Sequence, residues 1–435
     1  MTKQVAANPS YSNPGYKWYV LGLLVFIYIF GAVDRGVISV VAEPLKEAFN
    51  LSDSQIGALG GLAYSLPYAI FVLPMGWLVD RVNRRALLSV TVTVWSLCTT
   101  FSAFAGSYMS LVAARIGVGV AEAPASPASL SIIADTFPKR QRSTAVGIYY
   151  AGAAAGQFVI FILGGWVLLH YSWREVFLIA GLPGIILACL LFFTTREPVR
   201  GAYDEERKER RPSKGLFGGG PSPKQTIKEI FLEPALRYAL LANTFSTGVQ
   251  YSLMVWLVSF LVRIHGLSIS EAAIWVGVGV GVTQSIGSLL VGPIADRYSK
   301  GDAARLALIP ALATAAALLA GLVMTLAPSF SMAMVGLFAL AFFAGFFVAT
   351  GYSLILSLAA PDVRGTTLAT GKLLSVLIGG GLIPLMTGMI SDAVGGDESL
   401  RPAVLATVAL YSVATILFLL AGLSARKAIA KEQIS

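Results

Sequence analysis

The segment from Gly76 to Arg85 reads GWLVDRVNRR, and a related segment that begins at Gly292 reads GPIADRYSKG. Both contain the pattern G-x-x-x-D-R, and they lie about half a chain length apart in a sequence of 435 residues. A pattern repeated at that distance indicates two related halves. Each copy follows a long apolar run, so the repeat predicts two similar bundles of membrane helices with a site between them, as in many transporters.

The composition is that of an integral membrane protein. Charged residues make up 13% of the chain and apolar residues 56%, against typical soluble values of about 25% and 45–50%. Because backbone groups in lipid must be hydrogen-bonded within the protein, the spanning segments are expected to be helices. The fold class predicted from composition is therefore all-α and membrane-spanning.

Twelve apolar segments are long enough to cross a bilayer. They lie near residues 18–42, 54–79, 86–106, 109–135, 143–169, 173–195, 233–262, 270–295, 304–326, 330–359, 364–393 and 401–424. The charged and Gly/Pro/Ser-rich stretch 196–232 is expected to be a solvated linker. It separates two six-helix bundles, 18–195 and 233–424, and the terminal segments 1–17 and 425–435 complete the predicted organisation.

The basic residues follow the membrane topology. Most of the 32 Lys and Arg residues fall on one side if both termini are cytoplasmic, as the positive-inside rule requires. The net charge of +9 is therefore explained by topology and does not indicate nucleic-acid binding. We expect a multi-pass protein of a bacterial inner membrane, with no signal peptide before Trp18.

Adjacent charges interrupt the first apolar run, at Asp34 and Arg35 in FGAVDRGVIS. A charge at the centre of a membrane helix costs roughly 2.5–3.5 kcal/mol on insertion scales. Neighbours on a helix project about 100° apart, so the two cannot simply neutralise each other. Each is therefore expected to pair with a group on another helix.

Helix four supplies suitable partners in Arg115 and Glu122. They lie seven residues apart, so both project from one face of the helix. The four charges together would cost roughly 10–14 kcal/mol if unpaired, which predicts a neutral cluster with Asp34 and Arg35. In the functional interpretation Asp34 and Glu122 carry protons, and Arg35 and Arg115 bind an anionic substrate. The alternative is a purely structural set of ion pairs.

The repeated motif resembles the signature loop of the major facilitator superfamily between helices two and three. The matching positions are Gly76, Asp80, Arg81, Arg84 and Arg85. Gly76 is expected to permit close helix approach, and Asp80 to cap or charge-pair at a helix N-terminus. Asn83 replaces the usual glycine, and it tolerates a left-handed backbone. The resemblance implies a cytoplasmic latch, to which we add four residues: Asp135, Arg142, Asp296 and Arg297.

The first half is similar to the Spinster-like branch of that superfamily. The resemblance rests on GVGVAEAPASPASLSIIADTFPKRQRSTAVGIYYAGAAAGQ and WREVFLIAGLPGIILACLLFFTTREPVRG. It implies proton-linked transport of single-chain phospho- and sphingolipids, such as lysophospholipids and sphingosine phosphates. The branch's Asp-Arg pair in helix one matches Asp34 and Arg35, and its Arg and Glu in helix four match Arg115 and Glu122.

Further residues could line a lipid-binding cavity. Helix ten contains Phe342, Phe343, Phe346 and Phe347, which could form an apolar wall, although such aromatic residues more often serve packing or lipid contact. Polar contacts could come from Ser126, one turn beyond Glu122, and from Gln157 and Tyr251. The pair Gly152 and Gly156 predicts close helix packing.

Other chemistry is not supported by the sequence. Cys98 and Cys189 are single residues in different helices, so neither a disulfide nor a metal site is expected. His170 and His265 lie near helix ends, which argues against a hydrolase. The predicted protein is a monomeric, alternating-access transporter with protons as coupling ion and no other cofactor. Two alternatives stay open: a transporter of small organic anions or drugs, and an uncoupled lipid facilitator or scramblase.

Overall fold

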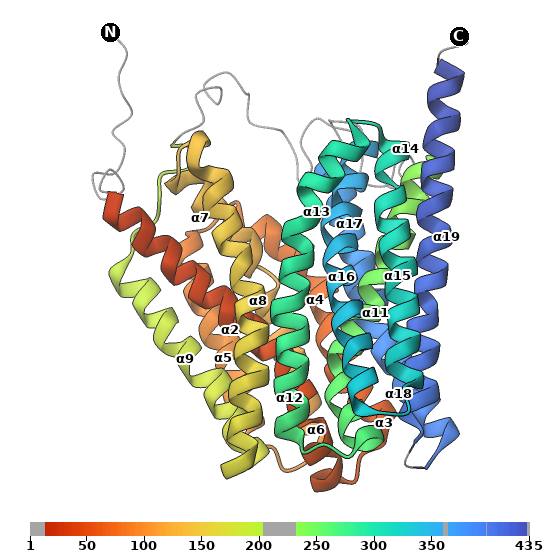
Figure 1. Ribbon diagram of the computed structural model, residues 1–435. Coiled ribbons are helices and arrows are strands. Elements are labelled where there is room, and N and C mark those ends of the chain that lie inside the picture. The colour runs from red at the N-terminus through yellow and green to blue at the C-terminus, as the bar shows by residue number, and fades with distance from the viewer. Residues whose placement is uncertain (1–13, 203–231, 360–363, 397, 433–435) are drawn as a thin grey trace. The chain divides into compact units, whose positions relative to one another are not determined.

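The computed structural model describes residues 14–202, 232–359, 364–396 and 398–432 (Figure 1). All regular elements within these ranges are helical. Eleven helical stretches in this part of the chain are long and apolar enough to cross a membrane. The remaining predicted span, 86–106, corresponds to α5 (Arg84–Ser102). This helix is less apolar because seven of its residues are Ser or Thr.

Two compact units divide the chain. The first comprises Met1–Pro44 and Leu66–Gly218, and the second comprises Leu45–Ser65 and Gly219–Ser435. The tip of the first helical hairpin, Leu45–Ser65, lies in the predicted bundle 18–195 but groups with the second unit. The division crosses α2 immediately after Pro44, a proline inside that helix.

The first unit is built from long helices joined by short connections. They are α2 (Pro14–Phe49), α4 (Leu62–Val79), α5, α6 (Tyr108–Glu122), α7 (Ala125–Thr136), α8 (Lys139–His170) and α9 (Trp173–Thr194), where the last residues of α2 and the first of α4 belong to the second unit. The predicted span 109–135 is interrupted between α6 and α7. Pro124 is the N-cap of α7, and its ring and missing N–H favour a break at this point.

Small residues set the helix spacing in this unit. A methyl group at Gly152 would lie 3.2 Å from the carbonyl oxygen of Val25, and one at Gly156 would clash with the carbonyl of Ile29. These contacts confirm the expected close approach of α8 to α2. At Gly76, a methyl group would meet no atom of the described residues within 4 Å. The close helix approach expected there stays a prediction.

The loop before α5 also differs from expectation. Asn83 has an extended backbone (φ −63°, ψ 110°), and its side-chain oxygen accepts a hydrogen bond from the Ala86 N–H at 2.8 Å. It therefore serves as the N-cap of α5, a role that Asn fills well, and it does not adopt the left-handed conformation. Asp80, which was expected to cap or pair at this position, is exposed.

The second unit contains the remaining helices. They are α3 (Asp53–Gly60), α11 (Pro234–His265), α12 (Ile269–Gly277), η2 (Val278–Thr283), α13 (Gln284–Ser299), α14 (Ala303–Leu306), α15 (Leu308–Leu326), α16 (Phe330–Leu358), α17 (Arg364–Leu374), η3 (Ser375–Leu382), α18 (Ile383–Val394) and α19 (Leu400–Glu432). The segments η2 and η3 are π-helical turns within longer helices. The last helix continues to Glu432, beyond the predicted span.

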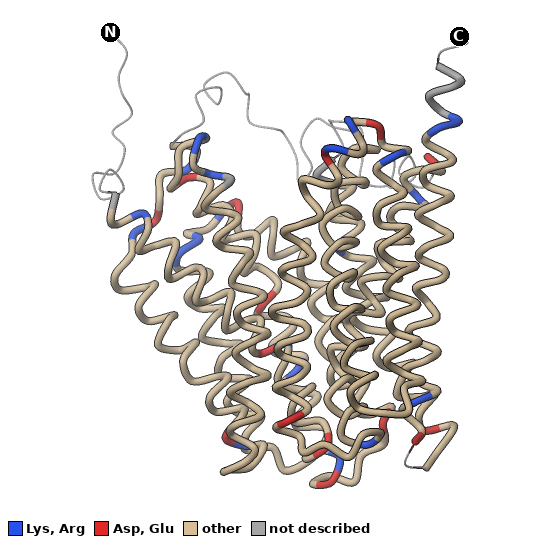
Figure 2. The backbone as a smooth tube through the Cα atoms, in the orientation of Figure 1, with Lys and Arg blue, Asp and Glu red and all other residues tan. Residues whose placement is uncertain are grey.

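Charged residues lie mainly toward the ends of the helices (Figure 2). One charged cluster joins α3 to its neighbours within the second unit. The Asp53 carboxylate accepts hydrogen bonds from Lys46 at 2.5 Å, Arg263 at 2.9 and 3.0 Å, and Ser391 at 2.6 Å. Asp392 in turn accepts from the backbone N–H groups of Asp53 and Ser54, both at 2.8 Å. The side chain of Asp53 is buried, so this cluster fixes the hairpin tip to α11 and α18.

Replacing Asp53 with alanine is expected to destabilise the protein. Removing one partner of a buried ion pair costs about 3–5 kcal/mol, because the other charge loses its compensation. The lower end applies here, since Lys46 and Arg263 retain some exposure. The thermal unfolding midpoint in detergent should fall clearly. Asp302→Asn is the control, because asparagine still caps α14; equal midpoints for both variants would contradict the assigned role of Asp53.

Candidate functional site

The four predicted intramembrane charges form two ion pairs between α2 and α6. In the first pair, Arg115 donates from Nη1 to Asp34 Oδ2 at 3.1 Å and from Nη2 to Asp34 Oδ1 at 3.2 Å. Arg115 Nη1 also donates to the Asp34 carbonyl at 3.2 Å. Both side chains are only 2–3% exposed. This pair is sealed inside the first unit.

The second pair is more accessible. Arg35 Nη1 donates to Glu122 Oε2 at 2.8 Å, and the side chains are 23% and 3% exposed respectively. Glu122 is the last residue of α6, where the negative end of the helix dipole does not favour a carboxylate. The guanidinium of Arg35 supplies the compensating charge. Adjacent residues of α2 thus pair with residues two turns apart on α6.

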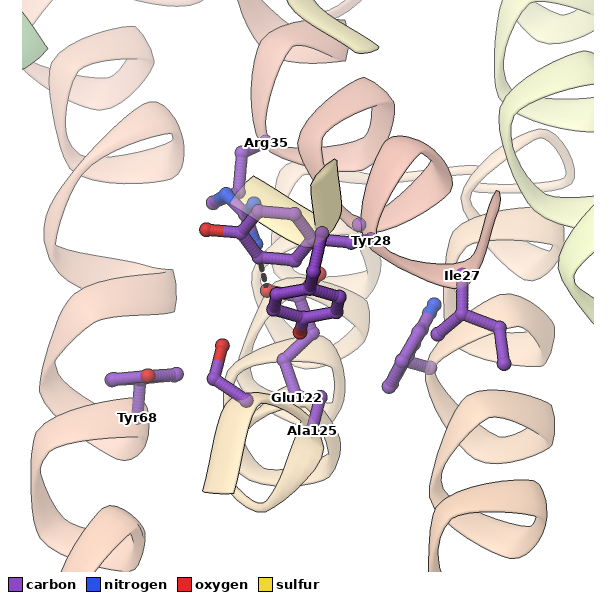
Figure 3. Close-up of a pocket in the computed structure, with 10 residues that line it drawn as sticks. Ile27, Tyr28, Arg35, Tyr68, Glu122 and Ala125 are labelled. Carbon is purple, nitrogen blue, oxygen red and sulfur yellow. Dashed lines mark hydrogen bonds and ion pairs between the residues drawn. The ribbon is translucent and has the colours of Figure 1, made fainter. Parts of the chain in front are cut away.

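A small pocket opens beside the second pair (Figure 3). Its volume of about 30 Å³ is enough for about two water molecules. Figure 3 shows Arg35 and Glu122 directed toward one another beside Tyr28. Polar groups and aromatic rings share the lining, which consists of Ile27, Tyr28, Gly31, Arg35, Tyr68, Trp95, Glu122, Ala125, Ser126 and Tyr149.

Stacked tyrosines form one wall of this pocket. The rings of Tyr28 and Tyr149 are 4.4 Å apart with an interplanar angle of 24°. The guanidinium of Arg35 lies 5.8 Å from the centre of the Tyr28 ring, within the range of a cation–π contact. The pocket therefore presents a cation, a carboxylate and aromatic surface together. At about 30 Å³ the pocket is far smaller than a typical ligand site, so in this conformation it has room only for water.

Gly31 leaves room for the Arg35–Glu122 pair. A methyl group at this position would lie 3.0 Å from Glu122 Oε1 and 3.5 Å from Arg35 Nη1. We expect Gly31→Ala to displace the pair and reduce transport several-fold. Gly22→Ala on the same helix should have no effect, because no atom of the described residues lies within 4 Å of a methyl group there. Initial transport rates of both variants measure this. Equal rates for wild type and Gly31→Ala would show that the pair does not need this spacing.

The other proposed substrate contacts lie in different places. Ser126 lines the pocket, and Gln157 donates to the Ala32 carbonyl at 3.1 Å, next to the charged segment of α2. Phe342, Phe346 and Tyr251 belong to the second unit. The rings of Phe342 and Phe346 are 5.1 Å apart, and Phe346 packs against a core cluster of α13 and α15. Helix packing therefore accounts for at least part of the aromatic pattern in α16.

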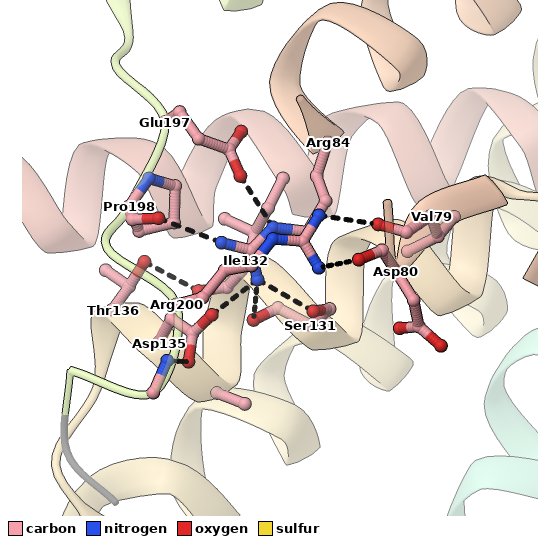
Figure 4. A network of polar contacts seen from close by, with 12 residues as sticks. Val79, Asp80, Arg84, Ser131, Ile132, Asp135, Thr136, Glu197, Pro198 and Arg200 are labelled. Atoms are coloured by element: carbon pink, nitrogen blue, oxygen red, sulfur yellow. Dashed lines mark hydrogen bonds and ion pairs between the residues drawn. The ribbon is translucent and has the colours of Figure 1, made fainter. Parts of the chain in front are cut away.

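The predicted latch residues of the first unit centre on Arg84 (Figure 4). The Arg84 side chain is 1% exposed, forms an ion pair with Asp135, and donates from Nε to Glu197 Oε1 at 2.6 Å. It also donates to Ser131 Oγ at 2.8 Å and to the Pro198 carbonyl at 2.9 Å. Arg84 thus joins α5 and α7 to the segment after α9.

That segment contains two residues that the sequence interpretation missed. Glu197 accepts from the Arg85 N–H at 2.9 Å as well as from Arg84. Arg200 donates to three carbonyls at the end of α4, those of Val79, Asp80 and Val82, at 2.6–2.8 Å. The first residues of the expected linker are therefore part of the network. The sequence signal was the charged residues of REPVR (196–200), which follow shortly after α9.

The remaining latch residues have separate partners. Arg85 donates to the Thr195 carbonyl at 2.7 Å, and Arg142 to the Ala134 carbonyl at 2.7 Å. Arg81 lies over the Trp77 ring at 4.0 Å. Asp296 and Arg297 are exposed near the end of α13 in the second unit. Arg84, Arg85, Asp135 and Arg142 therefore connect elements of the first unit, whereas Gly76 and the carboxylate of Asp80 do not lie in its interior.

Metal and thiol chemistry find no site in the described residues. No group of three or more His, Cys, Asp or Glu side chains there could hold a metal ion. Cys98 and Cys189 are both free thiols.

The family model described as "Major Facilitator Superfamily" matches residues 24–384. The chain belongs to this superfamily. A crystal structure of a bacterial homologue of the human lysosomal transporter Spinster, inward-facing and unoccupied, has a TM-score of 0.84 and 30% sequence identity; it covers 95% of this chain and 98% of its own. The same homologue in its occupied form has a TM-score of 0.80. These matches place the protein in the Spinster-like branch and confirm the predicted fold, a major facilitator transporter.

Two curated relatives cover nearly the whole chain. An MFS-type efflux pump of Mycolicibacterium smegmatis is 27% identical and covers 97% of this chain and 96% of its own length. A D-galactonate transporter of Escherichia coli is 27% identical, covering 88% and 91%. The superfamily and these relatives are transporters, so the protein is a multi-pass membrane transporter and not an enzyme.

Proposed function

We propose that this protein is a proton-coupled, alternating-access transporter of an amphiphilic anion, with a lysophospholipid or sphingosine-phosphate-like lipid as its cargo. The observation that supports this proposal most is the Arg35–Glu122 pair, which lies beside a pocket lined by aromatic rings. Buried ionisable groups in membrane helices are expensive and usually functional. The pair brings a proton acceptor and an anion-binding group to the same place.

The coupling follows from competition for Arg35. When Glu122 is ionised, its carboxylate forms an ion pair with the Arg35 guanidinium. When Glu122 takes up a proton, the guanidinium becomes available for a phosphate or carboxylate group of the substrate, which it binds through charge-assisted hydrogen bonds. Asp34 and Arg115 repeat this arrangement at a more deeply buried position. The substrate tail would lie against aromatic surface such as the Tyr28–Tyr149 wall.

A second candidate cargo is a small organic anion. Relatives are named as transporters of D-galactonate, of hexuronate in Escherichia coli and of gallate in Pseudomonas putida. The same Arg35–Glu122 exchange would serve these carboxylates. The aromatic rings beside Arg35 favour the amphiphile, because they offer apolar surface next to the cation. An uncoupled lipid facilitator is the third possibility, in which the charges only stabilise the helices.

Competition distinguishes the candidate cargoes. Purified monomer in liposomes would take up a fluorescent lysophospholipid under an imposed proton gradient, with unlabelled lysophospholipid, D-galactonate or gallate added in excess. We expect only the unlabelled lipid to suppress uptake. Suppression by either carboxylate would favour the small-anion function. Uptake that does not depend on the gradient would identify a facilitator.

We also propose that the protein lies in the bacterial inner membrane, with both termini on the cytoplasmic side.

A further inference from the structure

The hydroxyl groups of α5 do not all serve the same purpose. Most donate to a backbone carbonyl three or four residues earlier in the same helix, as Ser and Thr side chains in helices commonly do. These local donors are Thr91, Thr93, Thr100 and Ser102. Thr99 differs, because its Oγ1 donates to Asp34 Oδ1 on α2. One hydroxyl of α5 thus reaches the deeper of the two ion pairs.

The surroundings of Asp34 make this hydrogen bond significant. Asp34 and Thr99 are each 1% exposed. The charged and titratable groups that face Asp34 are Arg115 from α6 and the Cys98 thiol from α5. Arg35, the next residue on α2, is paired with Glu122. Gln157 of α8 donates to the carbonyl of Ala32, two residues before Asp34, and the Phe177 ring of α9 lies beside Arg115.

A hydroxyl donor favours the ionised form of a carboxylate. Arg115 is held against Asp34 by three hydrogen bonds, and Thr99 adds a neutral donor on the oxygen that Arg115 Nη2 also contacts. Both Thr99 and Arg115 therefore donate to the carboxylate oxygens of Asp34 and favour its charged form.

We propose that Thr99 is a positioning residue that holds the Asp34 carboxylate against Arg115, and that its hydroxyl sets the pH range over which transport is coupled to protons. This inference rests on the proposed function, in which Asp34 exchanges protons during the cycle. It assigns a role to a residue that contacts neither the pocket nor the substrate. The role depends on the hydroxyl and not on the size of the side chain.

The test compares Thr99→Val, which removes the hydroxyl and keeps the branched shape, with Thr99→Ser, which keeps the hydroxyl. Gradient-driven uptake of the lysophospholipid analogue in liposomes is measured as a function of pH. Loss of a hydrogen bond to a charged group should move the pH midpoint upward by about one pH unit. Thr99→Ser should retain the wild-type midpoint. Thr93→Val is the matched control, because it removes only a bond within α5.

Several outcomes would overturn this inference. A wild-type midpoint for Thr99→Val, or lower rates at every pH with no shift, would leave Thr99 a structural residue. If Thr99→Val does not fold, Thr99→Ala must show the shift instead. Asp34→Asn separates the two proposals. If Asp34→Asn keeps the wild-type pH dependence, coupling through Asp34 fails and the Thr99 role fails with it. If Asp34→Asn loses that dependence and Thr99→Val does not alter it, only the Thr99 proposal fails.

Discussion

Glu122→Gln is expected to abolish proton-driven accumulation of the substrate while leaving the protein folded. Glutamine has nearly the same shape and can still accept a hydrogen bond from Arg35, but it cannot take up or release a proton. Arg35 loses its opposite charge, and its partial exposure of 23% limits the cost of that loss. Uptake under an imposed proton gradient should fall to the level of liposomes without protein.

Substrate exchange separates coupling from binding in this variant. Exchange of labelled for unlabelled substrate across the membrane needs no net proton movement, so Glu122→Gln should retain it. Glu175→Gln is the control, because Glu175 caps the N-terminus of α9 and glutamine can fill the same role. Loss of both uptake and exchange would assign Glu122 to substrate binding or folding. Unchanged uptake would remove Glu122 from the coupling mechanism.

Arg84→Gln is expected to give the largest loss of stability. The substitution leaves the Asp135 and Glu197 carboxylates without their shared cation in a site where the arginine side chain is 1% exposed. Breaking such a buried pair costs about 3–5 kcal/mol. The segment after α9 should also be held less tightly, since Arg84 contacts it at both Glu197 and Pro198.

Thermal unfolding in detergent and limited proteolysis measure these two effects. The unfolding midpoint of Arg84→Gln should fall, and cleavage near residues 196–202 should become faster. Arg81→Gln is the control from the same motif. Its side chain is exposed and lies over Trp77, a contact worth about 0.5–1 kcal/mol. A wild-type midpoint for Arg84→Gln would mean that the motif arginine acts only in another conformation.

Much of the fold and the centre of the site follow from general constraints on membrane helices. Charges in apolar runs need partners, and the seven-residue spacing of Arg115 and Glu122 places them on one face of a helix. These two facts predict the charge cluster without any coordinates. The exact pairing, Asp34 with Arg115 and Arg35 with Glu122, requires the rotation of α2 against α6, which the sequence does not specify.

Residues whose role depends on contacts between distant helices were missed. Thr99 is one of seven Ser or Thr residues in α5, and no local pattern separates it from those that bond their own helix. Tyr28, Tyr68, Trp95 and Tyr149 line the pocket, but each is an ordinary aromatic residue in an apolar run. Asn83 was interpreted by analogy with glycine. An asparagine directly before the first residue of a helix equally predicts an N-cap.

The most direct test of the proposed mechanism follows protons and substrate in the same vesicles. Liposomes containing the protein and a trapped pH indicator would receive a lysophospholipid with no gradient imposed. We expect substrate addition to change the internal pH for wild type, and we expect Glu122→Gln to move no protons although it still exchanges substrate. A wild-type protein that transports the lipid without moving protons would contradict the central claim and leave the two ion pairs as structural contacts.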